Sequence, residues 1–160
     1  MRAILVFVLS YFPFYSLAAN LQGSPRVIDG DTIEIASTKI RLFGIDAPES
    51  KQTCFADKSE YACGEAAAQA LRDLISDREV RCEERGRDRY RRILAVCWVG
   101  ETEINAWMVR SGYALAFVRY TKTYVTEEAE AKSEKRGVWR GEFVYPWDWR
   151  STRGIMGDQD

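Results

Sequence analysis

The sequence predicts an α+β domain in which a five-stranded OB-fold β-barrel carries three α-helices. Short runs of alternating apolar and polar residues, typical of half-buried strands, come first along the chain. One helical pattern then interrupts the strands, and two more follow the last strand. The chain has 160 residues, which is enough for one domain with a real core.

The first 19 residues are predicted to be a secretory signal peptide. Arg2 is their only charge, residues 4–17 are almost entirely apolar or aromatic, and Ala18 and Ala19 end the segment as a small-residue cleavage site. The apolar run is shorter than the ~20 residues of a membrane-spanning helix, so an uncleaved anchor is the less favoured alternative. We expect an exported protein, periplasmic or extracellular, with no stable membrane association after cleavage.

One domain is expected over residues 20–150, beginning with a polar lead-in at residues 20–25. Turn residues, Asp29-Gly30-Asp31 and Ala36-Ser37-Thr38, separate the first three strands. The predicted strands are residues 26–28, 32–35, 39–45, 79–83 and 93–99. A polar loop at residues 50–63 precedes the first helix.

That first helix is expected at residues 65–77, where apolar residues recur at helical spacing. The second covers residues 102–111 and ends at Gly112, and residues 113–120 are expected to be extended or irregular. The third begins at a Thr126 cap. We expect the Trp-rich segment "VWRGEFVYPWDWR" to pack back on the body, and residues 151–160 to form a flexible C-terminal tail.

Four cysteines remain after signal cleavage, and an even number in an exported chain suggests disulfides. Three pairings are possible. We favour Cys54–Cys63 and Cys82–Cys97 because each closes a short local loop. In the simplest hairpin register, Cys82 also lies opposite Cys97. A zinc site is the alternative, but the chain has no C-x-x-C motif and no histidine.

The absence of histidine excludes Ser-His-Asp and Cys-His catalysis and every nuclease built on a histidine base. Any chemistry must therefore use carboxylates, arginines, tyrosines or a hard metal ion. Without Arg2, 22 basic residues face 24 acidic residues, which gives a net charge of 22 − 24 = −2. This charge argues against a general nucleic-acid coat protein and leaves room for a local basic site.

Two carboxylates are predicted to meet at the open end of a hairpin. If residues 32–45 fold as strand, turn and strand, Asp31 and Asp46 come close together and can share a hard cation such as Ca²⁺. Pro48 favours an extended backbone at Ala47, which directs the Ala47 carbonyl toward that cation. Each acidic motif by itself is more often only a turn or a loop.

Two arginines border apolar strands. Arg41 lies inside the run "KIRLF", where a guanidinium is costly unless it meets an anion or water. Arg92 ends the loop "ERGRDRYRR" and directly precedes an apolar strand, so it can point inward. The structural alternatives are a snorkelling surface arginine and a solvated basic loop. Two guanidiniums and a divalent cation around paired acids suit a phosphodiester substrate.

The motifs "VIDGDTIEI", "IRLFGIDAPE", "DRYRRILA", "MVRSGYA" and "GVW" occur in this order over residues 26–140. Together they resemble the staphylococcal nuclease (thermonuclease) family. The resemblance implies an OB-fold barrel with three helices and the Ca²⁺-dependent hydrolysis of DNA and RNA, leaving 3′-phosphate ends. It implies DNA and RNA as partners.

The same resemblance implies a role for eight positions. Asp31, Asp46 and the Ala47 carbonyl are expected to bind the metal, and Glu49 is expected to activate or orient the attacking water. Arg41 and Arg92 are expected to bind phosphate, and Tyr90 and Tyr120 to contact the nucleotide.

The chain departs from the family pattern at two of its site positions. Ala47 stands where a threonine is common, which matters little if only the backbone binds metal. Arg91 stands where the pattern D-[KR]-Y-G-R has glycine. The second change leaves open whether Arg92 or Arg91 grips phosphate, so Arg91 is also a candidate substrate-binding residue.

Two other functions remain as alternatives. One is a catalytically silent OB-fold module that binds single strands, although such modules usually lose an acid or an arginine that this chain keeps. The other is an extracellular protein that binds protein or sugar through its Trp-rich segment, which is more often core packing. No protein partner is indicated, and we expect a monomer.

Overall fold

The computed structural model describes residues 20–156, so the predicted signal peptide lies outside the described residues. Its main sheet has the strand order β1-β8-β9-β4-β3-β2, and β10 pairs with β9. The strands are β1 (Asn20–Gly23), β2 (Arg26–Asp29), β3 (Thr32–Ile35), β4 (Thr38–Leu42), β8 (Val80–Arg87), β9 (Ile93–Val99) and β10 (Thr102–Glu103). Two short pairs complete the strands: β5 (Ile45–Asp46) with β11 (Leu115–Ala116), and β6 (Cys54–Ala56) with β7 (Ser59–Tyr61).

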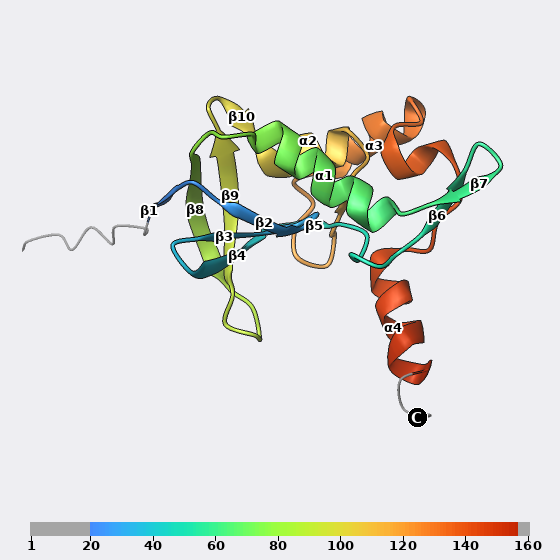
Figure 1. Cartoon of the computed structure of the whole chain (residues 1–160), viewed down its shortest axis with the longest axis horizontal. Helices are drawn as coiled ribbons and strands as arrows, with labels where there is room; N and C mark the ends of the chain where they lie inside the picture. The colour runs from blue at the N-terminus through green and yellow to red at the C-terminus, as the bar shows by residue number, and fades with distance from the viewer. Residues whose placement is uncertain (1–19, 157–160) are drawn as a thin grey trace, which may run out of the picture.

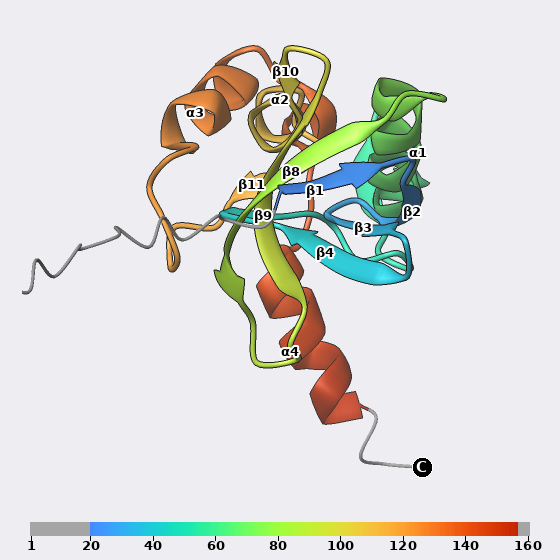
Figure 2. The ribbon, with the colours of Figure 1, turned by 90° about the vertical axis from the view of Figure 1, so that its left-hand side faces the viewer.

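The helices lie on two sides of the sheet (Figure 1). They are α1 (Cys63–Ile75), α2 (Ile104–Arg110), α3 (Val125–Ser133) and α4 (Pro146–Met156), with a 3₁₀ turn η1 (Gly137–Arg140). In the views of Figures 1 and 2, α4 and the β8–β9 loop extend to the same side, away from α2 and α3. None of the helices within residues 20–156 is long and apolar enough to cross a membrane.

The predicted α+β class and its OB-fold-like sheet are confirmed, and the five predicted strands correspond to β2, β3, β4, β8 and β9. The sheet is larger than predicted because the polar lead-in pairs with β8 as β1. The described part of the chain also has four α-helices rather than three. The polar loop at residues 50–63 contains the β6–β7 hairpin.

The extra helix is α4, which continues to Met156 through residues expected to form a flexible tail. Its first residue is Pro146, whose fixed φ suits the first helical position, and Asp148 lies in the first turn. α3 also differs from the prediction. It begins at Val125, preceded by Tyr124 with no side-chain cap, so Thr126 is not its cap.

β3 and β4 form the predicted hairpin, with Thr32 opposite Arg41. The Leu42 N–H donates to the Asp31 carbonyl at 2.8 Å and closes the open end. The predicted strand to residue 45 stops at Leu42 because Gly44 has a φ of +77°, which favours glycine. The chain then turns, and β5 pairs with β11 instead of continuing the hairpin.

Both favoured disulfides, Cys54–Cys63 and Cys82–Cys97, are present. Cys82 lies directly opposite Cys97 in the antiparallel β8–β9 pair, as the simplest register predicts. A bulge between Glu84 and Gly86 then shifts the register by one residue before the loop.

Apolar residues of the strands and of α1 and α2 form the main core, in which Ile33, Leu71 and Met108 are fully buried. A second cluster is built on the Cys54–Cys63 disulfide, and Trp139, Phe143 and Trp147 pack against it. The Trp-rich segment therefore packs on the body, as expected.

Candidate functional site

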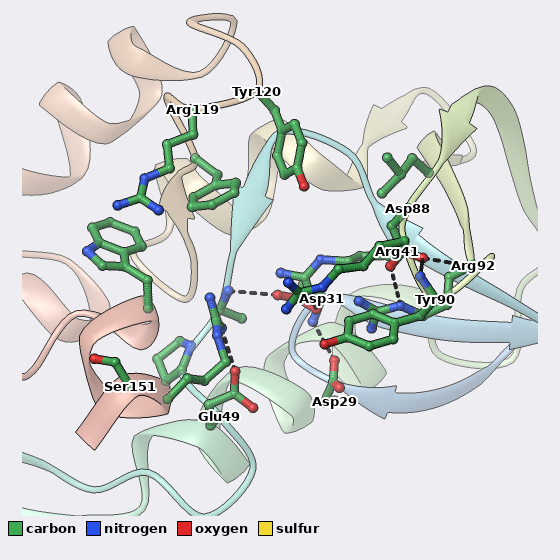
Figure 3. Close-up of a pocket in the computed structure, with 17 residues that line it drawn as sticks. Asp29, Asp31, Arg41, Glu49, Asp88, Tyr90, Arg92, Arg119, Tyr120 and Ser151 are labelled. Carbon is green, nitrogen blue, oxygen red and sulfur yellow. Dashed lines mark hydrogen bonds and ion pairs between the residues drawn. The ribbon is translucent and has the colours of Figure 1, made fainter. Parts of the chain in front are cut away.

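A pocket of about 840 Å³ opens between the β3–β4 hairpin, the β8–β9 loop, the segment after β11, and α4 (Figure 3). Seven of the nine side chains or backbone positions singled out in the sequence line it: Asp31, Arg41, Ala47, Glu49, Tyr90, Arg92 and Tyr120. The other two are Asp46, which is fully buried behind the pocket wall, and Arg91, which is exposed and does not line it.

Arg41 joins the two aspartates at the base of this pocket. It projects from β4, and its side chain is only 18% exposed. Nη1 donates to Asp31 Oδ1 and Nη2 to Asp46 Oδ1, each at 2.6 Å. Burial lowers the pKa of Arg41, but the two carboxylates raise it by more, so the pKa ends above its usual value. The cation in the apolar strand is therefore paired with two buried anions.

Asp31 is held rigidly as well as buried. Its Oδ1 accepts from the Thr32 hydroxyl at 3.0 Å, and its Oδ2 accepts from the Ala47 N–H at 2.9 Å. Burial raises the pKa of Asp31 to about 7, although Arg41 opposes the rise. A carboxylate in this environment is stabilised by additional positive charge.

α4 supplies a second cation that the sequence did not predict. Arg150 Nη2 donates to Asp46 Oδ2 at 2.8 Å, and Nη1 donates to Asp46 Oδ1 at 3.1 Å and to Glu49 Oε1 at 2.5 Å. Burial lowers the pKa of Arg150, but hydrogen bonds to both carboxylates raise it above its usual value. Arg150 thus links the predicted metal ligand Asp46 to the predicted water-orienting Glu49.

The β8–β9 loop is organised by Asp88. Its Oδ1 accepts from the backbone N–H groups of Tyr90 and Arg92, each at 2.9 Å, and its Oδ2 accepts from Arg92 Nε at 2.7 Å. Burial raises the pKa of Asp88, but the hydrogen bonds from Arg92 and Tyr90 lower it by more, so the pKa lies below its usual value. These bonds fix the direction in which the Arg92 side chain leaves the loop.

The two neighbouring arginines of the loop, Arg91 and Arg92, are placed differently. Arg91 stands where the family pattern has glycine, and its φ of +66° is the left-handed conformation that glycine adopts most easily. Its side chain is exposed, whereas Arg92 lines the pocket. The geometry therefore favours Arg92 as the residue that faces a substrate.

The residues fit a hard cation only in part. Among residues 20–156, no group of three or more His, Cys, Asp or Glu side chains is arranged to hold a metal ion. Asp31 and Asp46 nevertheless offer carboxylate oxygens, the donors that hard cations prefer, at a buried position where Arg41 and Arg150 now supply the positive charge. A cation there would need further oxygens from backbone carbonyls and water, and the Ala47 carbonyl is the backbone oxygen that the sequence predicts for this role.

The upper wall of the pocket in Figure 3 is aromatic and basic. Tyr120 on this wall is 61% exposed, and Tyr90, which lies across the pocket beside Asp29 and Arg92 in Figure 3, is 66% exposed. Such exposure is unusual for aromatic residues that only fill a core. Arg119 and Tyr120 lie on the opposite side of the pocket from Asp29 and Glu49 (Figure 3). An aromatic ring of a ligand can pack against this wall, next to the charged groups at the bottom of the pocket.

Sequence reasoning missed the contribution of α4. Arg150 lies 104 residues from Asp46, and nothing in a local motif connects them. The helix-start signal at Pro146 was the available clue, because it places Trp147, Arg150 and Ser151 at the spacing of one helix face.

Residues 39–141 match the family described as "Staphylococcal nuclease homologue". The chain is 40% identical over 129 residues to "Succinoglycan biosynthesis protein ExoI" of Rhizobium meliloti (strain 1021), covering 78% of this chain and 68% of that protein. It is 35% identical to an "Uncharacterized endonuclease" of Escherichia coli, covering 96% of this chain and 100% of that protein. It is 36% identical to "Micrococcal nuclease" of Shigella flexneri, covering 78% and 77%.

Proposed function

The chain belongs to the staphylococcal nuclease family, and we propose that it is an exported nuclease that hydrolyses phosphodiester bonds of DNA and RNA with the help of a divalent cation, expected to be Ca²⁺. The observation that carries the proposal is the pairing of Arg41 with both Asp31 and Asp46, at the base of a pocket that also holds Glu49 and Arg92. Acids and guanidiniums gathered in one pocket match the needs of phosphodiester hydrolysis.

Asp31, Asp46 and the Ala47 carbonyl are the groups that would hold the cation. When bound, the cation supplies positive charge that polarises a phosphate oxygen and positions the attacking water. Glu49 lies at the pocket wall, where it orients that water and accepts its proton as a general base.

Arg41 and Arg92 act on the phosphate itself. Their guanidinium forks bind phosphate oxygens and stabilise the charge that grows as water attacks phosphorus. Arg41 comes from a buried strand and Arg92 from a loop fixed by Asp88, so both cations are positioned before substrate arrives. No covalent enzyme intermediate is required, which agrees with a chain that has no histidine.

Cleavage of the 5′ P–O bond, leaving 3′-phosphate ends, is proposed from the family resemblance. Export is proposed from the apolar N-terminal sequence and is supported by the two disulfides, which persist in oxidising compartments.

The test incubates purified protein, from residue 20 onward, with DNA or RNA in Ca²⁺ or in chelator. We expect cleavage only with the cation and products that carry 3′-phosphate. Glu49→Gln should lower kcat by about a hundredfold or more. Glu65→Gln is the matched control, because it makes the same change at an exposed glutamate that does not line the pocket. Arg26→Ala is the control for the arginine variants, because Arg26 pairs with Glu34 and does not line the pocket. A gel shift without cleavage would identify a binding module instead.

A further inference from the structure

One face of α4 belongs to the pocket. Trp147, Arg150 and Ser151 are spaced i, i+3 and i+4, so they lie on one side of the helix, and all three line the pocket. Residues 39–141 contain the match to the family, and α4 lies beyond it. The helix therefore adds groups to the site that the matched region does not supply.

The first of these groups is aromatic. The Trp147 ring stacks on Tyr145 with centroids 4.8 Å apart and lies 5.9 Å from Phe117, which in turn lies 5.1 Å from Tyr120. The four rings form a row that connects α4 to the segment after β11. Trp147 is half-buried and faces the pocket, so it offers one surface to a flat ligand while its neighbours hold it in place.

The second group is cationic. Arg150 makes three hydrogen bonds to Asp46 and Glu49, whereas a guanidinium carries five donors, so it has capacity for an anionic ligand as well. Its side chain is 39% exposed, so a ligand in the pocket can reach it.

We propose that α4 forms a second nucleotide subsite beside the scissile phosphodiester, in which Trp147 stacks on an unpaired base and Arg150 binds the adjoining phosphate. The inference rests on the proposed function. Its ligand is a single-stranded stretch of DNA or RNA, because a paired base does not offer its face to an aromatic side chain. An aromatic ring beside a guanidinium is the combination that sequence-tolerant single-strand binding uses.

The test compares short oligodeoxythymidylates of increasing length. A minimal substrate is extended by one nucleotide at its 5′ or its 3′ end, and kcat/KM is measured for each. In the wild-type protein one of the two extensions should raise kcat/KM about five- to 150-fold, the range for one base–aromatic stack. An abasic nucleotide at the same end has the phosphate without the base. It should therefore keep only the part of the gain in kcat/KM that comes from the contact of Arg150 with that phosphate.

Two variants separate the base from the phosphate. Trp147→Leu keeps an apolar side chain in the second core and should remove the gain from the added base. Arg150→Ala should remove the gain that the abasic extension retains. Arg150 also contacts Asp46 and Glu49, so its replacement can change the absolute rate. Each variant is therefore judged by the ratio of kcat/KM for the extended substrate to kcat/KM for the minimal substrate. Arg26→Ala should leave this ratio unchanged.

A binding measurement supplies a readout that does not depend on turnover. A labelled oligodeoxythymidylate is titrated in chelator at several salt concentrations and followed by fluorescence anisotropy. Trp147→Leu should weaken binding with the same salt dependence, whereas Arg150→Ala should reduce the slope of log K against log salt by about 0.7. Equal slopes in the wild type and Arg150→Ala would overturn the phosphate assignment.

Failure of the subsite differs from failure of the proposed function. If the wild-type protein cleaves no oligonucleotide of any length, the proposed function is wrong. If it cleaves but gains nothing from either extension, or if both variants keep the full gain, the enzyme has no subsite on α4.

Discussion

Asp88 holds Arg92 through two hydrogen bonds, one to the backbone N–H at 2.9 Å and one to Nε at 2.7 Å. A single carboxylate therefore fixes both the loop and the arginine that projects from it. The side chain of Asp88 is only 8% exposed, so water competes little for these bonds. Arg92 thus reaches the pocket with its orientation already set.

Replacing Asp88 should disturb catalysis more than stability. We expect Asp88→Ala to lower kcat by about tenfold to a hundredfold, because a displacement of Arg92 by about 1 Å is enough for such a loss. Asp88→Asn keeps an oxygen acceptor and should recover part of the activity. Steady-state kinetics and thermal unfolding of both variants are the measurements. Equal activity of the alanine variant and the wild type would show that Asp88 does not position Arg92.

The neighbouring arginines give a matched pair of variants. Arg92→Ala removes a guanidinium from the pocket and should lower kcat/KM by about 10²- to 10³-fold. Arg91→Gly removes an exposed guanidinium and relaxes a φ of +66°, so activity should stay within about threefold of the wild type. Kinetics on one DNA substrate at one salt concentration would decide the assignment. The reverse order of effects would assign the phosphate contact to Arg91.

Asp31 predicts an unusual dependence of stability on pH in the absence of metal. Burial raises its folded-state pKa to about 7, above the value of about 3.9 in an unfolded chain. The folded state then binds this proton more tightly than the unfolded state does. Asp31 therefore contributes stability below about pH 4 that is lost as pH rises toward 7.

Asp31→Asn should consequently stabilise the metal-free protein at pH 8, by roughly 2 to 4 kcal/mol, while abolishing cleavage. The gain should disappear near pH 3, where Asp31 is protonated in both states. Urea unfolding in chelator at the two pH values is the measurement. A variant that is less stable than the wild type at pH 8 would show that the bond from Arg41 outweighs the cost of burying the Asp31 charge.

The base of the site could be predicted from the sequence because its members are close along the chain. Asp31 and Arg41 border one hairpin, in which Thr32 lies opposite Arg41, and Asp46 lies only five residues after Arg41 along the chain. The disulfide Cys82–Cys97 followed from the same kind of local register. Short-range geometry was sufficient for both predictions.

The contribution of α4 could not be predicted in this way. Arg150 meets Asp46 because Trp139 of η1, Phe143 and Trp147 of α4 pack on the second core, and this packing directs α4 toward the pocket. The sequence predicts that this Trp-rich segment packs on the body, but no local pattern fixes the direction in which α4 leaves it. The pairing of β5 with the distant β11 is likewise absent from any local pattern.

The two disulfides should contribute to stability and leave the chemistry untouched. Neither pair lines the pocket, and the bonds close loops with sequence separations of 9 and 15 residues. Loop-closure entropy predicts that the disulfides stabilise the folded state by about 2.5 and 3 kcal/mol, respectively.

Cys82→Ala/Cys97→Ala should therefore lower the free energy of unfolding by about 3 kcal/mol, and the folded fraction should keep its kcat. Denaturant unfolding with and without reductant, followed by activity at a temperature where the variant stays folded, tests both parts. Loss of activity in a fully folded double variant would mean that the β8–β9 pair must be cross-linked to hold the Arg92 loop in place.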